Sequence, residues 1–158
     1  MGNPDIHEEV EPIAFLLGTW RGEGKGVYPT IDDFAYGEEI EFRHNGKPFL
    51  IYAQKTWSLA DSSLMHSEMG YWRPQTEGKL EVVLAHPFGS TEILEGQVSG
   101  TEISLASTGL LHTSTGSAIH ATNRTLAIED GELVYTMAMS VGEQPLQNHL
   151  TGRLKKVG

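Results

Sequence analysis

Short segments rich in turn-forming residues recur at regular intervals along this chain and divide it into brief runs. These segments are HNGK (44–47), ADSS (60–63), TEGK (76–79), PFGS (87–90), SGTE (99–102), STGS (114–117), EDGE (129–132) and VGEQP (141–145). The runs predicted to be strands are 19–28, 36–44, 48–59, 64–74, 79–86, 90–98, 101–111, 118–129, 132–142 and 147–156. Strands of this length joined by tight turns are typical of an antiparallel, all-β protein.

The number of predicted strands favours a closed sheet over an open one. Closure removes the unpaired strand edges that an open sheet would expose. We therefore predict an all-β fold, a ten-stranded antiparallel up-and-down β-barrel. A barrel with more than eight strands leaves interior room for a small ligand.

One short helix is expected before the first strand, in EPIAFLLG (11–18). Pro12 suits the first turn of a helix and Gly18 suits its end. Because the segment is short and apolar, we expect it to cap the barrel. The whole chain, 1–158, is predicted to be a single domain, with 1–10 as a mobile tail.

Composition excludes several classes of partner and site. The formal net charge of −10 argues against nucleic acid or an anionic membrane as a partner, and no apolar run approaches the length of a membrane span. The absence of cysteine excludes disulfides, thiolate metal sites and a cysteine nucleophile. The N-terminal residues contain no hydrophobic leader, and we expect a cytoplasmic protein. We expect the protein to be a monomer or a homodimer.

Glycine alternates with other residues in LLGTWRGEGKG (16–26). Alternate residues of a strand share a face, so one face would carry Gly18, Trp20, Gly22, Gly24 and Gly26. One interpretation is that the bare strand bends sharply to close the barrel, with Trp20 at one end, packed by Arg153 as in lipocalin-like barrels. The other is that the bare face also leaves space for a flat, bulky ligand.

His149 lies on the last predicted strand, and its position gives conflicting signals. Its face also carries Thr151 and Arg153, while the alternate face is mainly apolar. If the interior were an ordinary core, His149 would point outward. A single histidine on a strand is more often hydrogen-bonded than bound to a metal.

Three further histidines are candidates for a ligand site. His66 shares a face with Glu68, and Met65 points the opposite way unless a bulge intervenes. His86 ends a predicted strand and fits a turn residue equally well.

His120 shares a face with Thr122 and Arg124, a polar set suited to anionic groups at a barrel mouth. A structural zinc site usually pairs its ligands closely in sequence. No such pairing occurs here, so any such site would have to be assembled by the fold.

The motif GTWRGEG (18–24) matches the G-x-W-x-G-x-G pattern of the nitrobindins, which are haem-binding β-barrels also described as peroxynitrite isomerases. Further blocks resemble that family in the same order, namely YPTI (28–31), GKPFL (46–50), LMHSEMGYWR (64–73), VLAHPFG (83–89) and QPLQNHL (144–150). The resemblance covers nearly the whole chain, and the bacterial members look most similar.

The resemblance implies a ten-stranded barrel like those of fatty-acid-binding proteins and lipocalins, which agrees with the strand count. It also implies a solvent-exposed haem b with His149 as the proximal iron ligand. It implies that Met65 and His66 lie near the distal face and Met139 near the haem edge, with Thr30 and Arg124 at the porphyrin periphery. The residues of the glycine motif, Gly18, Trp20, Gly22 and Gly24, are further candidates for cofactor binding. His120 is also a candidate, because it shares a face with Arg124.

The function implied by the resemblance is that of a ferric haem protein that binds NO and isomerises peroxynitrite to nitrate. One strong axial ligand leaves the iron an open position, and His66 would assist there as a catalytic residue through hydrogen bonding. The alternative is a haem-independent carrier of a fatty acid or another small hydrophobic ligand. A third reading is a haem sensor or carrier that acts on a partner protein.

Overall fold

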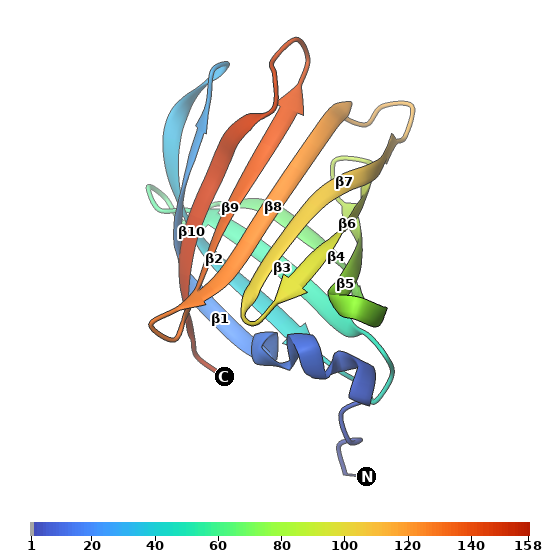
Figure 1. Ribbon diagram of the computed structural model, residues 1–158. Coiled ribbons are helices and arrows are strands. Elements are labelled where there is room, and N and C mark those ends of the chain that lie inside the picture. The colour runs from blue at the N-terminus through green and yellow to red at the C-terminus, as the bar shows by residue number, and fades with distance from the viewer. Residues whose placement is uncertain (1) are drawn as a thin grey trace.

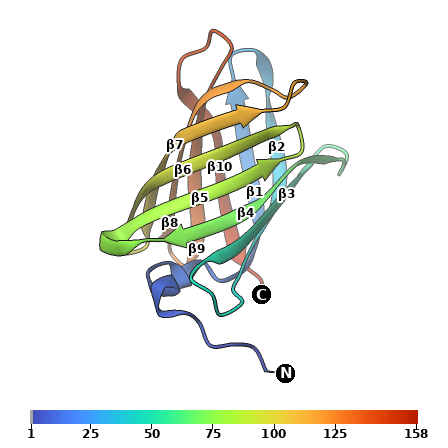
Figure 2. The same cartoon turned by 90° about the vertical axis from the view of Figure 1, so that its right-hand side faces the viewer.

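The computed structural model describes residues 2–158, whose ten strands form one closed antiparallel barrel. Each strand pairs with the next along the chain, and the last returns to pair with the first (Figure 1). The strands are β1 (Gly18–Tyr28), β2 (Ile31–Arg43), β3 (Leu50–Ser58), β4 (Leu64–Pro74), β5 (Lys79–His86), β6 (Ser90–Ser99), β7 (Glu102–His112), β8 (Ile119–Glu129), β9 (Glu132–Val141) and β10 (Gln147–Lys156). The predicted fold class and strand number are confirmed. From the side, β4 to β7 form the near wall, and β1, β2 and β10 lie behind it (Figure 2).

A 3₁₀ helix, η1 (Glu8–Leu16), precedes the barrel and lies at the end where both chain termini are found (Figure 1). It buries Val10, Ile13 and Leu16 completely, so it caps the barrel as expected. Its start corrects the prediction, because residues 8–10 belong to the helix and not to a tail. A second 3₁₀ segment, η2 (Thr76–Gly78), joins β4 to β5. No helix within residues 2–158 is long and apolar enough to cross a membrane.

The glycines of β1 are covered by the chain's own side chains. A Cβ atom added to Gly24 would lie 2.3 Å from the ring of Tyr36, and one added to Gly26 would lie 2.1 Å from the ring of Phe34. A Cβ added to Gly22 would lie 2.1 Å from the carbonyl oxygen of Arg153 on β10. The space on this face is therefore filled by aromatic rings and by a close strand–strand approach, which corrects the expectation that it directly accommodates a macrocycle.

Trp20 lies at the capped end of the barrel, where its indole Nε1 donates a hydrogen bond of 2.8 Å to the carbonyl of Leu16. The basic residue over its ring is Lys156, whose Nζ is 5.8 Å from the ring centroid. The prediction that Arg153 packs on Trp20 is therefore wrong. Residue 153 pairs with Glu23 across the sheet, whereas residue 156 pairs with Trp20.

Three of the candidate histidines lie at irregularities in the strand register. In β10, His149 is the extra residue between Asn148 and Leu150, which face consecutive residues of β9. Met65 and His66 both lie opposite one residue of β3, and His120 is the extra residue of β8. A β-bulge re-aims side chains relative to strict alternation, so strand parity misplaces these residues.

Candidate functional site

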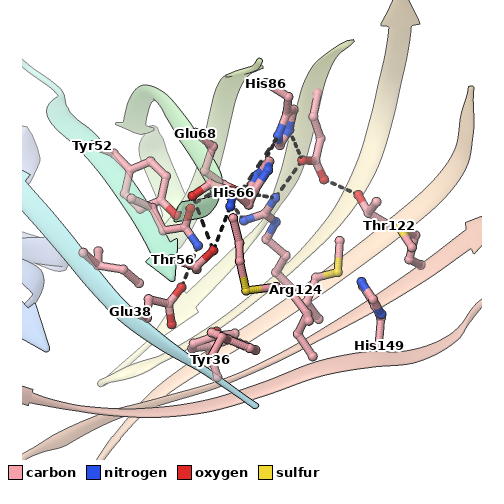
Figure 3. A pocket seen from close by; sticks show the side chains of 18 of the residues that line it. Tyr36, Glu38, Tyr52, Thr56, His66, Glu68, His86, Thr122, Arg124 and His149 are labelled. Carbon is pink, nitrogen blue, oxygen red and sulfur yellow. Dashed lines mark hydrogen bonds and ion pairs between the residues drawn. The ribbon is translucent and has the colours of Figure 1, made fainter. Parts of the chain in front are cut away.

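A cavity of about 260 Å³ occupies the barrel interior. Its wall combines apolar and aromatic side chains with a buried group of charged ones (Figure 3). Met65 and Phe88 line it yet remain partly exposed, so the cavity reaches the surface near them. Since β1 runs from the capped end at Gly18 towards Tyr28, the cavity residues beside Tyr28 lie away from η1.

His149 lines this cavity because of the bulge that carries it. Its Nδ1 lies 3.0 Å from the carbonyl oxygen of Val27 on β1, and a carbonyl only accepts, so Nδ1 carries the proton. The neutral imidazole therefore bears its lone pair on Nε2. A histidine fixed in this way by an acceptor on one nitrogen is prepared to bind a transition metal with the other.

Two aromatic rings hold the His149 imidazole in position. The Tyr28 ring packs edge-on at 5.3 Å between centroids, and the Phe34 ring at 6.3 Å. Tyr28 is itself fixed, because its hydroxyl donates to the carbonyl of Met139 at 3.3 Å and accepts from the amide of Val141 at 3.0 Å. This arrangement restricts the orientation of the ring on the cavity wall.

A buried ion-pair network connects β4, β6 and β8 inside the barrel. Arg124 Nη1 donates to Glu68 Oε2 at 2.7 Å, and its Nη2 donates to Glu92 Oε1 at 2.7 Å. Tyr52 also donates to Glu68 Oε2, at 3.0 Å, and the Thr122 hydroxyl donates to Glu92. The guanidinium is therefore neutralised by two carboxylates.

Two histidines join this network (Figure 3). His86 Nε2 lies 2.9 Å from Glu92 Oε1, and His86 Nδ1 lies 3.3 Å from His66 Nε2. His66 Nε2 also lies 3.2 Å from Glu68 Oε1. The His86 side chain is 5% exposed and that of His66 is 30% exposed, so His66 lies nearer to solvent.

The network keeps its carboxylates ionised. Burial alone would raise the pKa of Glu68, but Arg124, His66 and His86 together hold it well below its usual value. For Glu92, burial is likewise outweighed by Arg124 and His86, which lower the pKa of that carboxyl. Both groups therefore carry negative charge at neutral pH.

A second buried carboxyl group, that of Glu38, lies beside the network, and its pKa is raised where those of Glu68 and Glu92 are lowered. Glu38 is buried, accepts a hydrogen bond of 2.7 Å from Gln54 Nε2, and leaves its Oε1 without a partner among the described residues. Burial raises the pKa of Glu38 to about 7. Burial also raises the pKa values of Tyr36 and Tyr135, whose hydroxyls hydrogen-bond to each other.

The structure brings together only part of the predicted site. His149, Met65, His66, Met139 and Arg124 all line the cavity. Arg124 is held inside by Glu68 and Glu92, so its guanidinium is already paired. Thr30 is exposed in the turn between β1 and β2.

The remaining predicted residues lie elsewhere. Gly18 and Trp20 are at the capped end, and the glycines at 22 and 24 pack against β10 and the Tyr36 ring. His120 is exposed, and Ile119 lines the cavity in its place. The bulge at His120 breaks the alternation that had placed it on the face of Arg124.

Sequence reasoning missed the acidic partners and the aromatic supports of the site. Glu92 lies two residues before the buried Leu94, and Glu38 lies two residues before the buried Ile40. A charged residue that shares a strand face with buried apolar residues was therefore the sequence pattern that could have indicated these buried carboxylates. No comparable signal marks Val27, which contributes only a carbonyl group.

Nearly the whole chain is similar in sequence to known proteins. Residues 9–156 match the family described as the THAP4-like, heme-binding beta-barrel domain. The chain is 44% identical over 156 residues to peroxynitrite isomerase 2 of Mycobacterium marinum, covering 96% of this chain and 97% of the relative. It is 43% identical over 155 residues to a peroxynitrite isomerase of Arabidopsis thaliana, covering 98% and 93%.

A solved structure is also similar. The crystal structure of Rv2717c from M. tuberculosis superimposes with a TM-score of 0.90 at 40% sequence identity. The match covers 98% of this chain and all of that one. The ten-stranded barrel described above is thus the fold of a solved relative.

Proposed function

The chain belongs to the family of THAP4-like, haem-binding β-barrel domains, and we propose that it isomerises peroxynitrite to nitrate at a haem held by His149. The curated relatives at 43–44% identity carry the name peroxynitrite isomerase. The observation that carries the proposal is the His149 imidazole, which lines the cavity with Nδ1 bonded to the Val27 carbonyl.

The residues present fit a haem. Nε2 of His149 is free to bind iron, and the wall around it offers apolar and thioether side chains, including Phe34, Met137 and Met139. When bound, haem would supply an iron with an open coordination position that polarises the O–O bond of peroxynitrite. The protein would supply the fixed imidazole of His149, an apolar wall that limits water, and a polar group nearby.

His66 is the residue that we propose to hydrogen-bond the substrate. It is partly exposed in the cavity, and its Nε2 is already engaged by Glu68 and His86. Its Nδ1 is then the atom left to face a small oxyanion, and it donates a hydrogen bond to that oxyanion in the imidazolium form, in which both ring nitrogens carry protons. Isomerisation moves an oxygen within one molecule and consumes no proton, so one positioned hydrogen bond is sufficient assistance.

The test compares haem-loaded protein with protein that lacks haem. We expect haem-loaded wild type to accelerate peroxynitrite decay and to raise the yield of nitrate. His66→Gln should slow the reaction by about tenfold, which corresponds to the loss of one hydrogen bond. His112→Gln, at an exposed position, is the matched control. Equal decay rates with and without haem would refute the proposal.

The lipid-carrier alternative has less support in this cavity. A fatty-acid carboxylate needs an available cation, and the guanidinium of Arg124 is occupied by two carboxylates. Haem b as the haem type, NO as a ligand, a cytoplasmic location and a monomeric or homodimeric state stay predictions.

A further inference from the structure

We propose that the barrel holds a second ligand site, for one divalent transition-metal ion of the Zn²⁺ type, formed by His66, His86 and Glu68. The ligand atoms would be His66 Nε2, His86 Nδ1 and Glu68 Oε1, which all lie within 4.8 Å of one another. These residues come from β4 and β5, whereas His149 comes from β10. The proposal therefore does not depend on haem.

The spacing of the three atoms matches a tetrahedral ion. His66 Nε2 lies 3.2 Å from Glu68 Oε1 and 3.3 Å from His86 Nδ1, and His86 Nδ1 lies 3.9 Å from Glu68 Oε1. Zinc binds histidine nitrogen and carboxylate oxygen at about 2.0–2.2 Å, so tetrahedral ligand atoms stand roughly 3.3–3.6 Å apart. Small shifts of the His86 ring bring all three into range.

The tautomer of His86 is already the one that a metal requires. Glu92 is ionised and accepts from His86 Nε2 at 2.9 Å, so the proton of neutral His86 is on Nε2 and the lone pair is on Nδ1. Nδ1 is the atom that faces His66 and Glu68 (Figure 3). A carboxylate bonded to the distal nitrogen of a metal-binding histidine is the usual supporting arrangement.

Glu68 divides its two oxygens between different partners. Oε2 receives the stronger bonds, from Arg124 Nη1 at 2.7 Å and Tyr52 at 3.0 Å. Oε1 faces the histidines, with His66 Nε2 at 3.2 Å, and its contact with Arg124 Nη2 is longer, at 3.4 Å. One oxygen therefore anchors the carboxylate while the other remains available to an ion.

The local charge also favours a cation. Glu68 and Glu92 contribute two negative charges and Arg124 contributes one positive charge, which leaves a net charge of −1 with both histidines neutral. Two nitrogens and one oxygen suit zinc and its neighbours better than Mg²⁺ or Ca²⁺, which prefer all-oxygen ligand sets. Three protein ligands leave a fourth position for water from the cavity.

The experiment titrates Co²⁺ into protein free of haem and follows its visible absorbance, then displaces Co²⁺ with Zn²⁺. Wild type should bind one equivalent tightly with a four-coordinate spectrum. His66→Gln and His86→Gln should lose this site. Glu92→Gln keeps the three ligands but replaces the carboxylate that supports His86 and pairs with Arg124, and it should weaken the site about 10- to 100-fold. Thermal melts verify that each variant is folded. Because the His66 side chain is more exposed than that of His86, His66→Gln should disturb the fold less than His86→Gln.

Two variants separate this site from other metal binding. His120→Gln removes an exposed histidine outside the cavity and should leave the titration unchanged. His149→Ala should also retain Co²⁺ binding while it loses haem, so the failure of one proposal does not imply failure of the other. Absence of a four-coordinate spectrum in wild type, or identical titrations for wild type and His66→Gln, would overturn the proposal.

Discussion

A single buried carboxyl group, Glu38, contributes a characteristic pH dependence to stability. Burial raises its pKa from 4.5 to about 7, so the folded protein binds this proton more tightly than the unfolded chain does. Its contribution is therefore fully present below about pH 4.5 and is lost as the pH rises towards 7. A shift of this size corresponds to about 3 kcal/mol of unfolding free energy.

Glu38→Gln tests this prediction, because the amide stays neutral at every pH. Wild type should lose about 3 kcal/mol more unfolding free energy between pH 4.5 and 7.5 than the variant does. Urea unfolding at a series of pH values measures the difference. Parallel stability curves for the two proteins would show that Glu38 is ionised in the fold at neutral pH.

The guanidinium of Arg124 is the second residue whose loss we expect to matter strongly. Arg124→Met leaves Glu68 and Glu92 as neighbouring buried charges without their counter-ion. Breaking a buried ion pair in this way costs about 3–5 kcal/mol. Arg21→Met is the control, because its pair with Glu39 at 3.5 Å is on the surface and is worth at most about 1 kcal/mol. Similar losses for both variants would contradict the assigned role of the network.

At the scale of residues, the sequence predicted which histidines belong to the site better than it predicted the direction in which each side chain points. His149 and His66 were singled out, and both line the cavity. Strand parity nevertheless pointed His149 outward and placed His120 beside Arg124. Both errors have one cause, since each histidine is the extra residue of a bulge and alternation cannot locate a bulge from a single sequence.

The elements of the barrel depend on close approaches that only glycine permits. At Gly22, an added Cβ would lie 2.1 Å from the Arg153 carbonyl oxygen, and that atom is backbone. Gly22→Ala must therefore separate β1 from β10, where the barrel closes, and we expect a loss of about 1–3 kcal/mol or more.

Gly109→Ala on β7 is the matched control for this substitution. Its added Cβ would lie 3.4 Å from Ile93, an ordinary contact, so its unfolding free energy should stay much closer to that of wild type. Thermal melts of the two variants make the comparison. A smaller loss for Gly22→Ala than for Gly109→Ala would contradict the proposed role of the close approach.

At the scale of elements, all ten strands were predicted, and turn chemistry marked eight of their nine connections but not all of the strand bounds. β2 begins at Ile31, five residues before its predicted start, because β1 and β2 are joined by a tight turn at Pro29 and Thr30 that lacks the usual glycine or asparagine. The helix is 3₁₀ and begins at Glu8. Its apolar residues were correctly expected to cap the barrel.

For the whole molecule, the regular turns and the ordered motif blocks together predicted the architecture and the family, and both are confirmed. The polar interior was not predicted, because Glu68, Glu92 and Arg124 are 24 or more residues apart in sequence. Their meeting depends on closure of the sheet and on its register, which local patterns do not encode. The barrel thus presents the His149 imidazole on one wall and a charged network on another.

The most direct test is a titration of hemin into haem-free protein, followed by the Soret band, for wild type and His149→Ala. The account predicts that wild type saturates at one haem per chain, with the spectrum of a histidine-bound haem. His149→Ala should bind at least about 10-fold more weakly or show an altered spectrum, while His120→Ala should match wild type. If His149→Ala and wild type give the same spectrum and the same affinity, His149 is not the iron ligand and the central claim is wrong.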